Sequence, residues 1–274
     1  MSTLKVIILI SALSGLLMIV GYLVGRGKGI VIALILSAVM NFGSYWFSDS
    51  IVLKMYDARP VTQEEAPLLY DAVEDLAIRA AIPMPKLYII PSDAPNAFAT
   101  GRNENHAAVA VTSGLLNLMN PDELQGVIAH ELSHIKHKDI LISTMAATIA
   151  SAVVLLSRWS LFFSSDDGSV VSAIAVAVIA PVAATLVQMA ISRSREYDAD
   201  TGSAKITGKP EALAGALMKL SDTAKQAPMH ANPATAHMFI VSPLSGGTIM
   251  GLFSTHPPVE ERIERLLAMK GGWT

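Results

Sequence analysis

The residues with the clearest chemical potential are two histidines four positions apart, His130 and His134, with Glu131 directly after the first. On an α-helix, side chains at positions i and i+4 lie on one face, about one turn apart. Two imidazoles spaced in this way can bind one metal ion, and the adjacent carboxylate can take a proton from a water on that metal. Zinc lowers the pKa of such a water to about 7. The pattern therefore predicts hydrolysis by zinc-activated water, with Glu131 as the general base.

A third ligand is needed, because a catalytic zinc usually has three protein ligands and one open position. The chain has no cysteine, which leaves His, Asp and Glu. A metzincin-type third histidine would stand at position 140, where the sequence has Ile140. Glu196 supplies the gluzincin alternative, and Asp200, one turn later, could orient a ligand histidine through its second ring nitrogen. We predict that His130, His134 and Glu196 bind one Zn²⁺ per subunit.

The elements that must carry these residues are two helices, over residues 121–138 and 193–206. The first begins with a favourable cap, because Asn120 is followed three residues later by Glu123. His137 is a weaker ligand candidate near its end, and its flanking lysines favour an interfacial basic cluster instead. A further amphipathic helix is predicted over residues 62–81, with short strands over 86–90 and 106–111. Residues 226–250 have no clear period and are interpreted as a loop or flap.

Apolar residues make up 52% of the 274-residue chain and charged residues only 16%, against about 25% in ordinary soluble domains. Four apolar runs approach the roughly 20 residues that cross a bilayer; they cover residues 6–24, 30–47, 140–163 and 170–191. Only residues 25–29 separate the first two, which predicts a tight helical hairpin. The first run is long for a signal peptide, and a second span follows it at once.

The predicted fold is a mainly α integral membrane protein, with about four transmembrane helices and a gluzincin-type α+β zinc peptidase domain. Four regions follow: a transmembrane hairpin (1–50), the first peptidase part with the zinc-binding helix (51–139), a second hairpin (140–191), and the second peptidase part with the third ligand (192–274). Lysine and arginine are in excess beside the peptidase parts, which favours the cytosol for the catalytic domain. The net charge of −3 argues against nucleic acid as a partner.

Four motifs together resemble the HtpX-type membrane metallopeptidases, which are relatives of the CAAX prenyl proteases. They are residues 95–102 (PNAFATGR), 130–139 (HELSHIKHKD), 192–200 (SRSREYDAD) and 254–263 (STHPPVEERI). The resemblance covers most of the chain. It implies a zinc endopeptidase of the bacterial inner membrane that acts in quality control of misfolded or damaged membrane proteins under stress. The implied partners are membrane-protein and unfolded polypeptide substrates, and the lipid bilayer.

The resemblance also implies roles for three further residues. His256 would stabilise the oxyanion, Arg262 would hold the substrate backbone or orient His256, and Asn96 would bind the peptide. The residues alone leave other interpretations open, since a histidine before a proline, such as His256, is also typical of the start of a turn. Likewise, Arg262 on a solvated helix could pair with a nearby glutamate.

Three other classes of protein fit the sequence less well. A site-2-type intramembrane protease would carry the His-Glu-x-x-His motif inside an apolar span, whereas here charged residues stand at both ends of the motif helix. A CAAX prenyl protease would have more than four spans. A membrane metal-binding or transport protein would place ionisable residues inside the spans, and these spans are nearly free of them.

Overall fold

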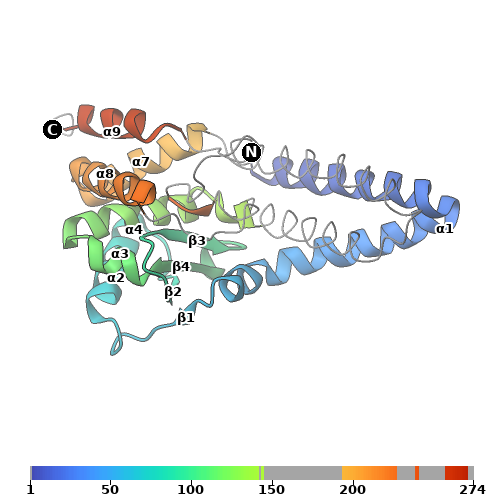
Figure 1. The fold of residues 1–274 in the computed structure, drawn as a ribbon, viewed down its shortest axis with the longest axis horizontal. Helices are drawn as coiled ribbons and strands as arrows, with labels where there is room; N and C mark the ends of the chain where they lie inside the picture. The colour runs from blue at the N-terminus through green and yellow to red at the C-terminus, as the bar shows by residue number, and fades with distance from the viewer. Residues whose placement is uncertain (1, 142, 145–192, 227–237, 241–256, 271–274) are drawn as a thin grey trace.

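The computed structural model describes residues 2–141, 143–144, 193–226, 238–240 and 257–270. Within them, a helix-rich body contains a four-stranded sheet, and a long helical hairpin projects from this body (Figure 1). The helices are α1 (Ser2–Met55), α2 (Pro67–Ala80), α3 (Ser113–Leu118), α4 (Pro121–Lys136), α7 (Arg193–Thr207), α8 (Pro210–Gln226), α9 (Val259–Ala268) and the 3₁₀ helix η1 (Glu104–His106). The strands are β1 (Arg59–Pro60), β2 (Lys86–Ile90), β3 (Ala97–Gly101) and β4 (Ala107–Thr112).

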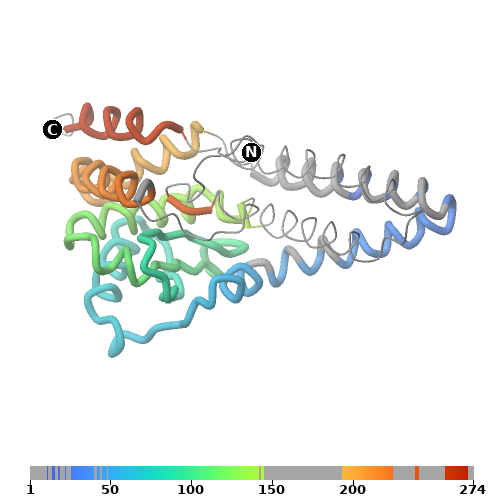
Figure 2. Tube along the Cα trace, in the orientation of Figure 1, coloured from blue at the N-terminus to red at the C-terminus, as the bar shows by residue number. Residues whose placement is uncertain are grey.

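Within the part of the chain that the structure describes, the projecting hairpin is formed by α1. Its helical path breaks at Arg26, where φ is 49° and ψ is −132°, and the chain reverses direction there (Figures 1 and 2). Ser37 on the returning arm donates a 2.6 Å hydrogen bond between hydroxyls to Ser14 on the outgoing arm. The break falls inside the predicted turn at residues 25–29, so the hairpin expected from the sequence is present.

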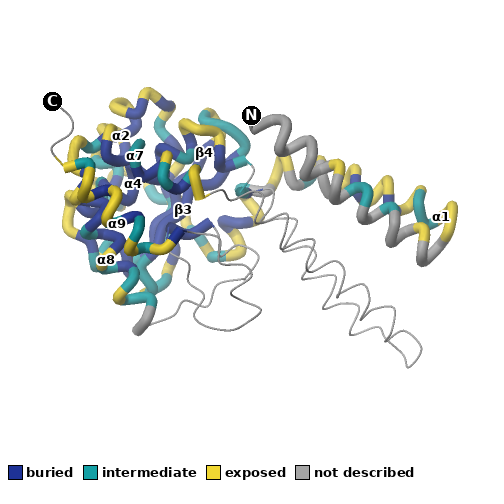
Figure 3. Tube along the Cα trace, turned by 90° about the horizontal axis from the view of Figure 1, so that it is seen from above, coloured by how far each residue is buried: buried dark blue, intermediate teal, exposed yellow. Residues whose placement is uncertain are grey.

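The returning arm of α1 leaves many large apolar side chains exposed, in contrast to the buried interior of the body (Figure 3). They include Val31, Ile32, Leu34, Ile35, Val39, Phe42, Trp46 and Phe47. Across the described residues, however, no helix has both the length and the apolar character needed to cross a membrane. The first two predicted spans are therefore not confirmed. The other two lie almost wholly outside the described residues.

The sheet has the order β1-β2-β4-β3, which puts β3 at an edge. β2 and β4 are parallel, whereas β3 runs antiparallel to β4, with Ala97 opposite Val111 and Gly101 opposite Ala107. The predicted strand 86–90 matches β2, and the strand predicted at 106–111 is β4 shifted by one residue. β3 was not predicted, because its Ala-Phe-Ala-Thr-Gly sequence is poor in strand-forming residues and depends on β4 for its conformation.

Helix α2 is shorter than the predicted 62–81 at its N-terminal end. Pro67 occupies the first helical position, and Ala66 before it has φ −141° and ψ 62°, outside the helical region. A residue that precedes proline is sterically disfavoured from helical backbone angles, so the helix cannot extend back through residue 66. At the other end, Ala81 takes a left-handed conformation and stops the helix.

Helix α4 lies at the centre of the body, in contact with the sheet and with α2, α7 and α8 (Figure 3). The predicted cap is present: Asn120 accepts from the Glu123 backbone and the Glu123 carboxylate accepts from Asn120 in return. Small residues allow the neighbouring helices to approach closely. A side chain at Gly126 would come within 2.7 Å of the Leu213 backbone in α8, and one at Gly202 in α7 would overlap the Ser133 hydroxyl.

A short described segment, Met238 to Ile240, also belongs to the interior. Phe239 is fully buried and packs edge-on against Phe98 of β3 and Tyr56 beyond α1. The backbone N–H of Ile240 donates to the carbonyl of Ala97 on β3. This part of the predicted flap is therefore packed in the core. The rest of residues 227–250 lies outside the described residues.

Candidate metal centre

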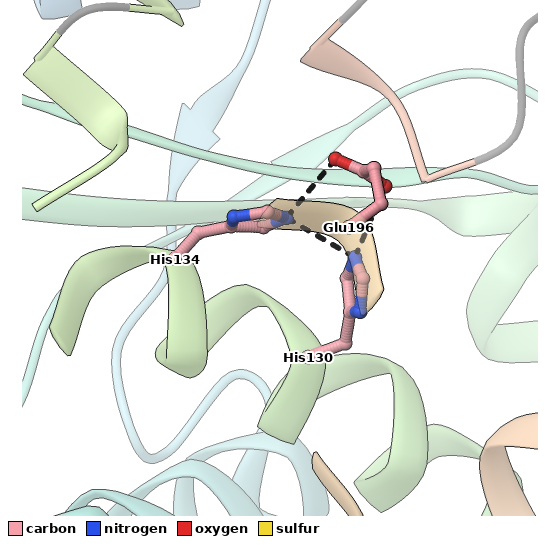
Figure 4. Close-up of side chains that lie close together, drawn as sticks. All are labelled: His130, His134 and Glu196. Atoms are coloured by element: carbon pink, nitrogen blue, oxygen red, sulfur yellow. Dashed lines mark hydrogen bonds and ion pairs between the residues drawn. The ribbon is translucent and has the colours of Figure 1, made fainter. Parts of the chain in front are cut away.

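The structure brings together the three predicted metal ligands, although they come from two distant parts of the chain. His130 and His134 project from one face of α4, and Glu196 projects towards them from the first turn of α7 (Figure 4). The Nε2 atoms of the two histidines are 3.2 Å apart. Glu196 Oε2 lies 3.8 Å from His130 Nε2, and its Oε1 lies 3.5 Å from His134 Nε2.

These three separations suit a small tetrahedral cation. With zinc bonded at 2.0–2.2 Å, two ligand atoms of a tetrahedron are about 3.3–3.5 Å apart, close to the separations found here. One ligand atom from each residue lies within 4.8 Å of the others. The residues present therefore fit a metal ion with two imidazole ligands and one carboxylate.

The hydrogen bonds of the two imidazoles support the same conclusion. His130 Nδ1 lies 3.0 Å from Asp200 Oδ1, and His134 Nδ1 lies 3.4 Å from Asp139 Oδ2. A carboxylate can only accept, so each neutral ring carries its proton on Nδ1 and leaves a lone pair on Nε2. When His134 carries a second proton, its Nε2–H can donate to His130 Nε2 across this 3.2 Å gap, and a cation bound there would take the place of that proton.

Burial and nearby charges act in different proportions on the pKa values of the two histidines. Burial lowers the pKa of His130 to about 4, so its ring is neutral and available as a ligand. Burial also opposes the charging of His134. However, the hydrogen bond to Asp139 and the charges of Glu196 and Glu131 outweigh it and raise its pKa to about 9. The acidic groups that favour a proton on His134 would equally favour a bound cation.

Asp200 and Arg262 form a buried pair behind His130. Arg262 donates from Nε at 2.9 Å and from Nη2 at 2.7 Å to the two Asp200 oxygens, and donates from Nη1 at 2.9 Å to the carbonyl of Ile240. Burial raises the pKa of Asp200, but the Arg262 charge outweighs it and holds that pKa below its usual range. The Arg262 side chain is fully buried, so it is not on the solvated helix face that the sequence left open as an alternative.

Glu131 lies beside the three clustered residues and is 3% exposed. Burial raises the pKa of its carboxyl to about 7, and the negative charge of Glu196 adds to the rise. Its carboxylate also accepts a hydrogen bond from the backbone N–H of Ala99. Glu131 thus connects the centre to the edge strand β3.

Asn96 stands at the start of this edge strand and is 4% exposed. Its backbone N–H donates to the Thr112 hydroxyl at 2.9 Å, and its side-chain oxygen accepts from the Ala97 N–H at 3.1 Å. His256 lies outside the described residues, so the structure places only its neighbours Pro257 and Pro258. His137 is exposed at the C-cap of α4 and is not one of the three clustered residues.

Two residues with side chains next to the centre were not singled out by the sequence analysis. They are Asp139, just beyond the end of the motif helix, and Arg195, which directly precedes Glu196. In the structure, Asp139 contacts His134 with one oxygen and Arg195 with the other. The position of Asp139 at the end of the motif helix was the one available signal, and it did not indicate which way the side chain points.

Comparisons with known proteins give the class of this site. Residues 63–270 match Peptidase family M48. A protease HtpX homolog of Desulforapulum autotrophicum is 58% identical over 269 residues, covering 94% of this chain and 87% of the relative. Another from Pyrococcus furiosus is 55% identical over 276 residues, covering 97% of this chain and 96% of the relative. The chain belongs to peptidase family M48, among the HtpX proteases.

A solved structure shares the fold at much lower sequence identity. The crystal structure of S. mikatae Ste24p aligns with a TM-score of 0.52 and 19% identity. The alignment covers 97% of this chain but only 65% of Ste24p. Family membership makes the chain a metallopeptidase, and the cluster of His130, His134 and Glu196 is compatible with its metal.

Proposed function

We propose that this chain is a zinc-dependent endopeptidase bound to a membrane, with His130, His134 and Glu196 as the metal ligands. The observation that carries the proposal is the spacing of the two Nε2 atoms and the Glu196 carboxylate oxygens, which is close to that of a tetrahedral zinc site. Both Nε2 lone pairs face the same point because carboxylates hold both Nδ1 atoms. Zinc in this position would supply a Lewis acid that polarises the scissile carbonyl and makes a water acidic.

The remaining steps belong to side chains of the protein. Glu131 is placed to accept the proton of the attacking water and to pass it to the leaving amine. Asp200 holds the His130 ring in the tautomer that presents Nε2. We assign Asn96 to binding of the peptide and His256 to stabilisation of the oxyanion, as the resemblance to the family implies.

Arg262 is assigned differently from the sequence-based expectation. Its guanidinium is fully buried and is bound by Asp200 and the Ile240 carbonyl, so we assign it to support of the centre. Its Nη1 also lies 3.7 Å from Glu196 Oε2, which adds a positive charge behind the third ligand. Contact between Arg262 and the substrate backbone would require these bonds to rearrange.

The membrane location rests on the sequence and on α1. Four apolar runs are present in the chain, and the returning arm of α1 exposes a row of large apolar side chains that water would not favour. We propose a multi-pass protein of the bacterial inner membrane with its catalytic domain in the cytosol. Its substrates would be misfolded or damaged membrane proteins and unfolded polypeptides. Retention in the membrane pellet after an alkaline carbonate wash tests the location, and release into the supernatant would contradict it.

The proposed chemistry is tested with two variants of the full chain in detergent. Glu131→Gln keeps all three ligands, so zinc content should stay full while cleavage of casein and of the chain itself falls by about 10²–10⁴-fold. Glu196→Ala removes a ligand, so zinc content and cleavage should fall together. Cleavage by Glu131→Gln close to the wild-type rate, or full zinc occupancy of Glu196→Ala at low free zinc, would overturn these assignments.

A further inference from the structure

We propose that Asp139 is a positioning residue that ties together the two halves of the metal centre. This inference rests on the function proposed above. The Oδ2 atom of Asp139 lies 3.4 Å from His134 Nδ1, and its Oδ1 atom lies 3.3 Å from Arg195 Nη1. His134 belongs to the first half of the site, and Arg195 immediately precedes Glu196 in the second half. One carboxylate therefore contacts both ligand-bearing helices.

The backbone brings Asp139 to this place through the way in which α4 ends. The N–H of Asp139 donates to the carbonyl of His134 at 3.0 Å, and the N–H of Lys138 donates to the carbonyl of Ile135 at 3.0 Å. These two bonds, with His137 as the C-cap, form a Schellman motif. The motif folds the chain back over the last turn of the helix, so that the Asp139 side chain reaches the His134 ring.

The residue at the left-handed position of this motif carries a conformational cost. Lys138 has φ 61°, in a region where glycine is the usual residue and a side chain costs roughly 1–2 kcal/mol. The chain nevertheless keeps the motif with lysine in this position. The two backbone hydrogen bonds of the motif and the contacts of Asp139 with His134 and Arg195 all act against this cost.

The second contact gives Asp139 an effect on Glu196. Residues 137–192 separate the two helices in sequence, and packing between α4 and α7 holds them side by side. The Asp139–Arg195 contact adds a link at the end of this interface that lies next to Glu196. The side chains of Asp139 and Arg195 are 11% and 14% exposed, which protects their ion pair from full solvent screening. Fixing Arg195 fixes the first helical turn of α7, and with it the direction in which Glu196 projects.

The side-chain role can be separated from the backbone role. The Asp139 carbonyl accepts from the Ser143 N–H at 3.2 Å, and this bond does not depend on the side chain. Asp139→Asn keeps the size and a hydrogen-bond acceptor for His134 but loses the charge that pairs with Arg195. Asp139→Ala loses both contacts. A graded effect of these two substitutions is therefore expected from positioning through the carboxylate.

The test measures the metal affinity of the full chain in detergent, by competition with a chromophoric zinc chelator. Outer carboxylates of this kind typically contribute 10–100-fold to metal affinity. We expect about 10-fold weaker zinc binding for Asp139→Asn and towards 100-fold for Asp139→Ala. The visible spectrum of the Co²⁺-substituted protein should also change, because the His134 ring is free to turn. Unchanged affinity and spectrum in both variants would overturn the proposal.

A double-substitution cycle tests the link between the halves. Arg195→Met alone should weaken zinc binding. In the double variant Asp139→Asn/Arg195→Met, the fold-loss of zinc affinity should be smaller than the product of the two single losses, because both substitutions remove the same contact. Independent, multiplicative losses would contradict a shared contact. Asp122→Asn is the matched control, because it breaks the exposed 2.7 Å pair of Asp122 with Lys209 near the start of the same helix. This control should bind zinc normally.

Two comparisons keep the outcomes distinct. If wild type does not bind zinc, or if Glu196→Ala binds it as tightly as wild type, the proposed function fails together with this inference. If Glu196→Ala loses zinc while the Asp139 variants do not, the inference alone fails. Should Asp139→Ala not fold, Lys138→Val supplies a second route, since a β-branched residue strongly disfavours φ 61° and would displace Asp139 while leaving its side chain intact. Full zinc affinity in a folded Lys138→Val chain would count against the proposal.

Discussion

The two histidines of the centre are supported by similar groups in different surroundings. Behind each ring stands an aspartate that is itself held by an arginine: Asp200 with Arg262 at His130, and Asp139 with Arg195 at His134. We call the first the inner support and the second the outer support.

Burial and bond length separate the two. The inner support is closed from water, with 0% exposure for the Arg262 side chain and 2% for that of Asp200, and its shortest ion-pair contact is 2.7 Å. The outer support has 14% and 11% exposure and a 3.3 Å contact. A buried charge that loses its partner is costly, and this cost falls as water reaches the pair. The inner support should therefore hold the fold as well as the metal, and the outer support mainly the metal.

The largest effect is expected when the inner arginine is removed. Arg262→Met leaves the Asp200 charge buried without its partner, so the free energy of unfolding should fall by roughly 3–5 kcal/mol. Arg195→Met should cost clearly less, because its pair is longer and more accessible to water. Denaturant unfolding of the metal-free variants measures both.

Adding Asp200→Asn to Arg262→Met removes the unpaired buried charge and should recover part of the lost stability. Equal losses from the two arginine variants would erase the distinction between the supports.

A smaller effect is expected for metal binding when the inner carboxylate is neutralised. Asp200→Asn should weaken zinc affinity by about 10–100-fold, because the His130 ring loses a charged acceptor on Nδ1. The loss should be at least as large as that of Asp139→Asn, since the Asp200 contact is shorter and more buried. Chelator competition with both proteins side by side decides this, and a clearly larger loss for Asp139→Asn would reverse the ranking.

The smallest effect concerns the backbone that carries the outer support. Lys138→Gly removes the conformational cost at φ 61° without altering Asp139, so it should stabilise the fold by about 0.5–1 kcal/mol. Zinc affinity should stay at the wild-type value. If Lys138→Gly destabilised the chain, the left-handed conformation at this position would not be a source of strain.

The contrast between the supports also separates what the sequence predicted from what it did not. Local signals located the ligand helices: the capping box at Asn120, the i, i+4 histidines and the spacing from Glu196 to Asp200 are all short-range patterns. The arginine partners are long-range. Arg262 meets Asp200 across 62 residues and Arg195 meets Asp139 across 56, and no periodicity in one sequence relates such pairs.

The same limit applies to the fold. Strand β2 was predicted from its own residues, whereas β3 depends on pairing with β4 and the burial of Phe239 depends on packing against Phe98 and Tyr56. The predicted start of α2 was wrong by five residues. The amphipathic pattern continues before Pro67, but the proline disfavours helical backbone angles at the residue that precedes it. Local preferences were sufficient to identify the three residues that cluster in the structure, and tertiary contacts were needed to explain how they are held.

The central claim is that His130, His134 and Glu196 form one zinc site, and X-ray absorption at the zinc edge tests it most directly. The full chain in detergent, loaded with one equivalent of zinc, should show four nitrogen or oxygen neighbours at about 2.0–2.1 Å with the outer-shell scattering of two imidazoles. His134→Ala should lose the scattering of one imidazole, and Glu196→Ala should change the first shell. A first shell that is unaffected by these two substitutions, or one that lacks imidazole, would contradict the account.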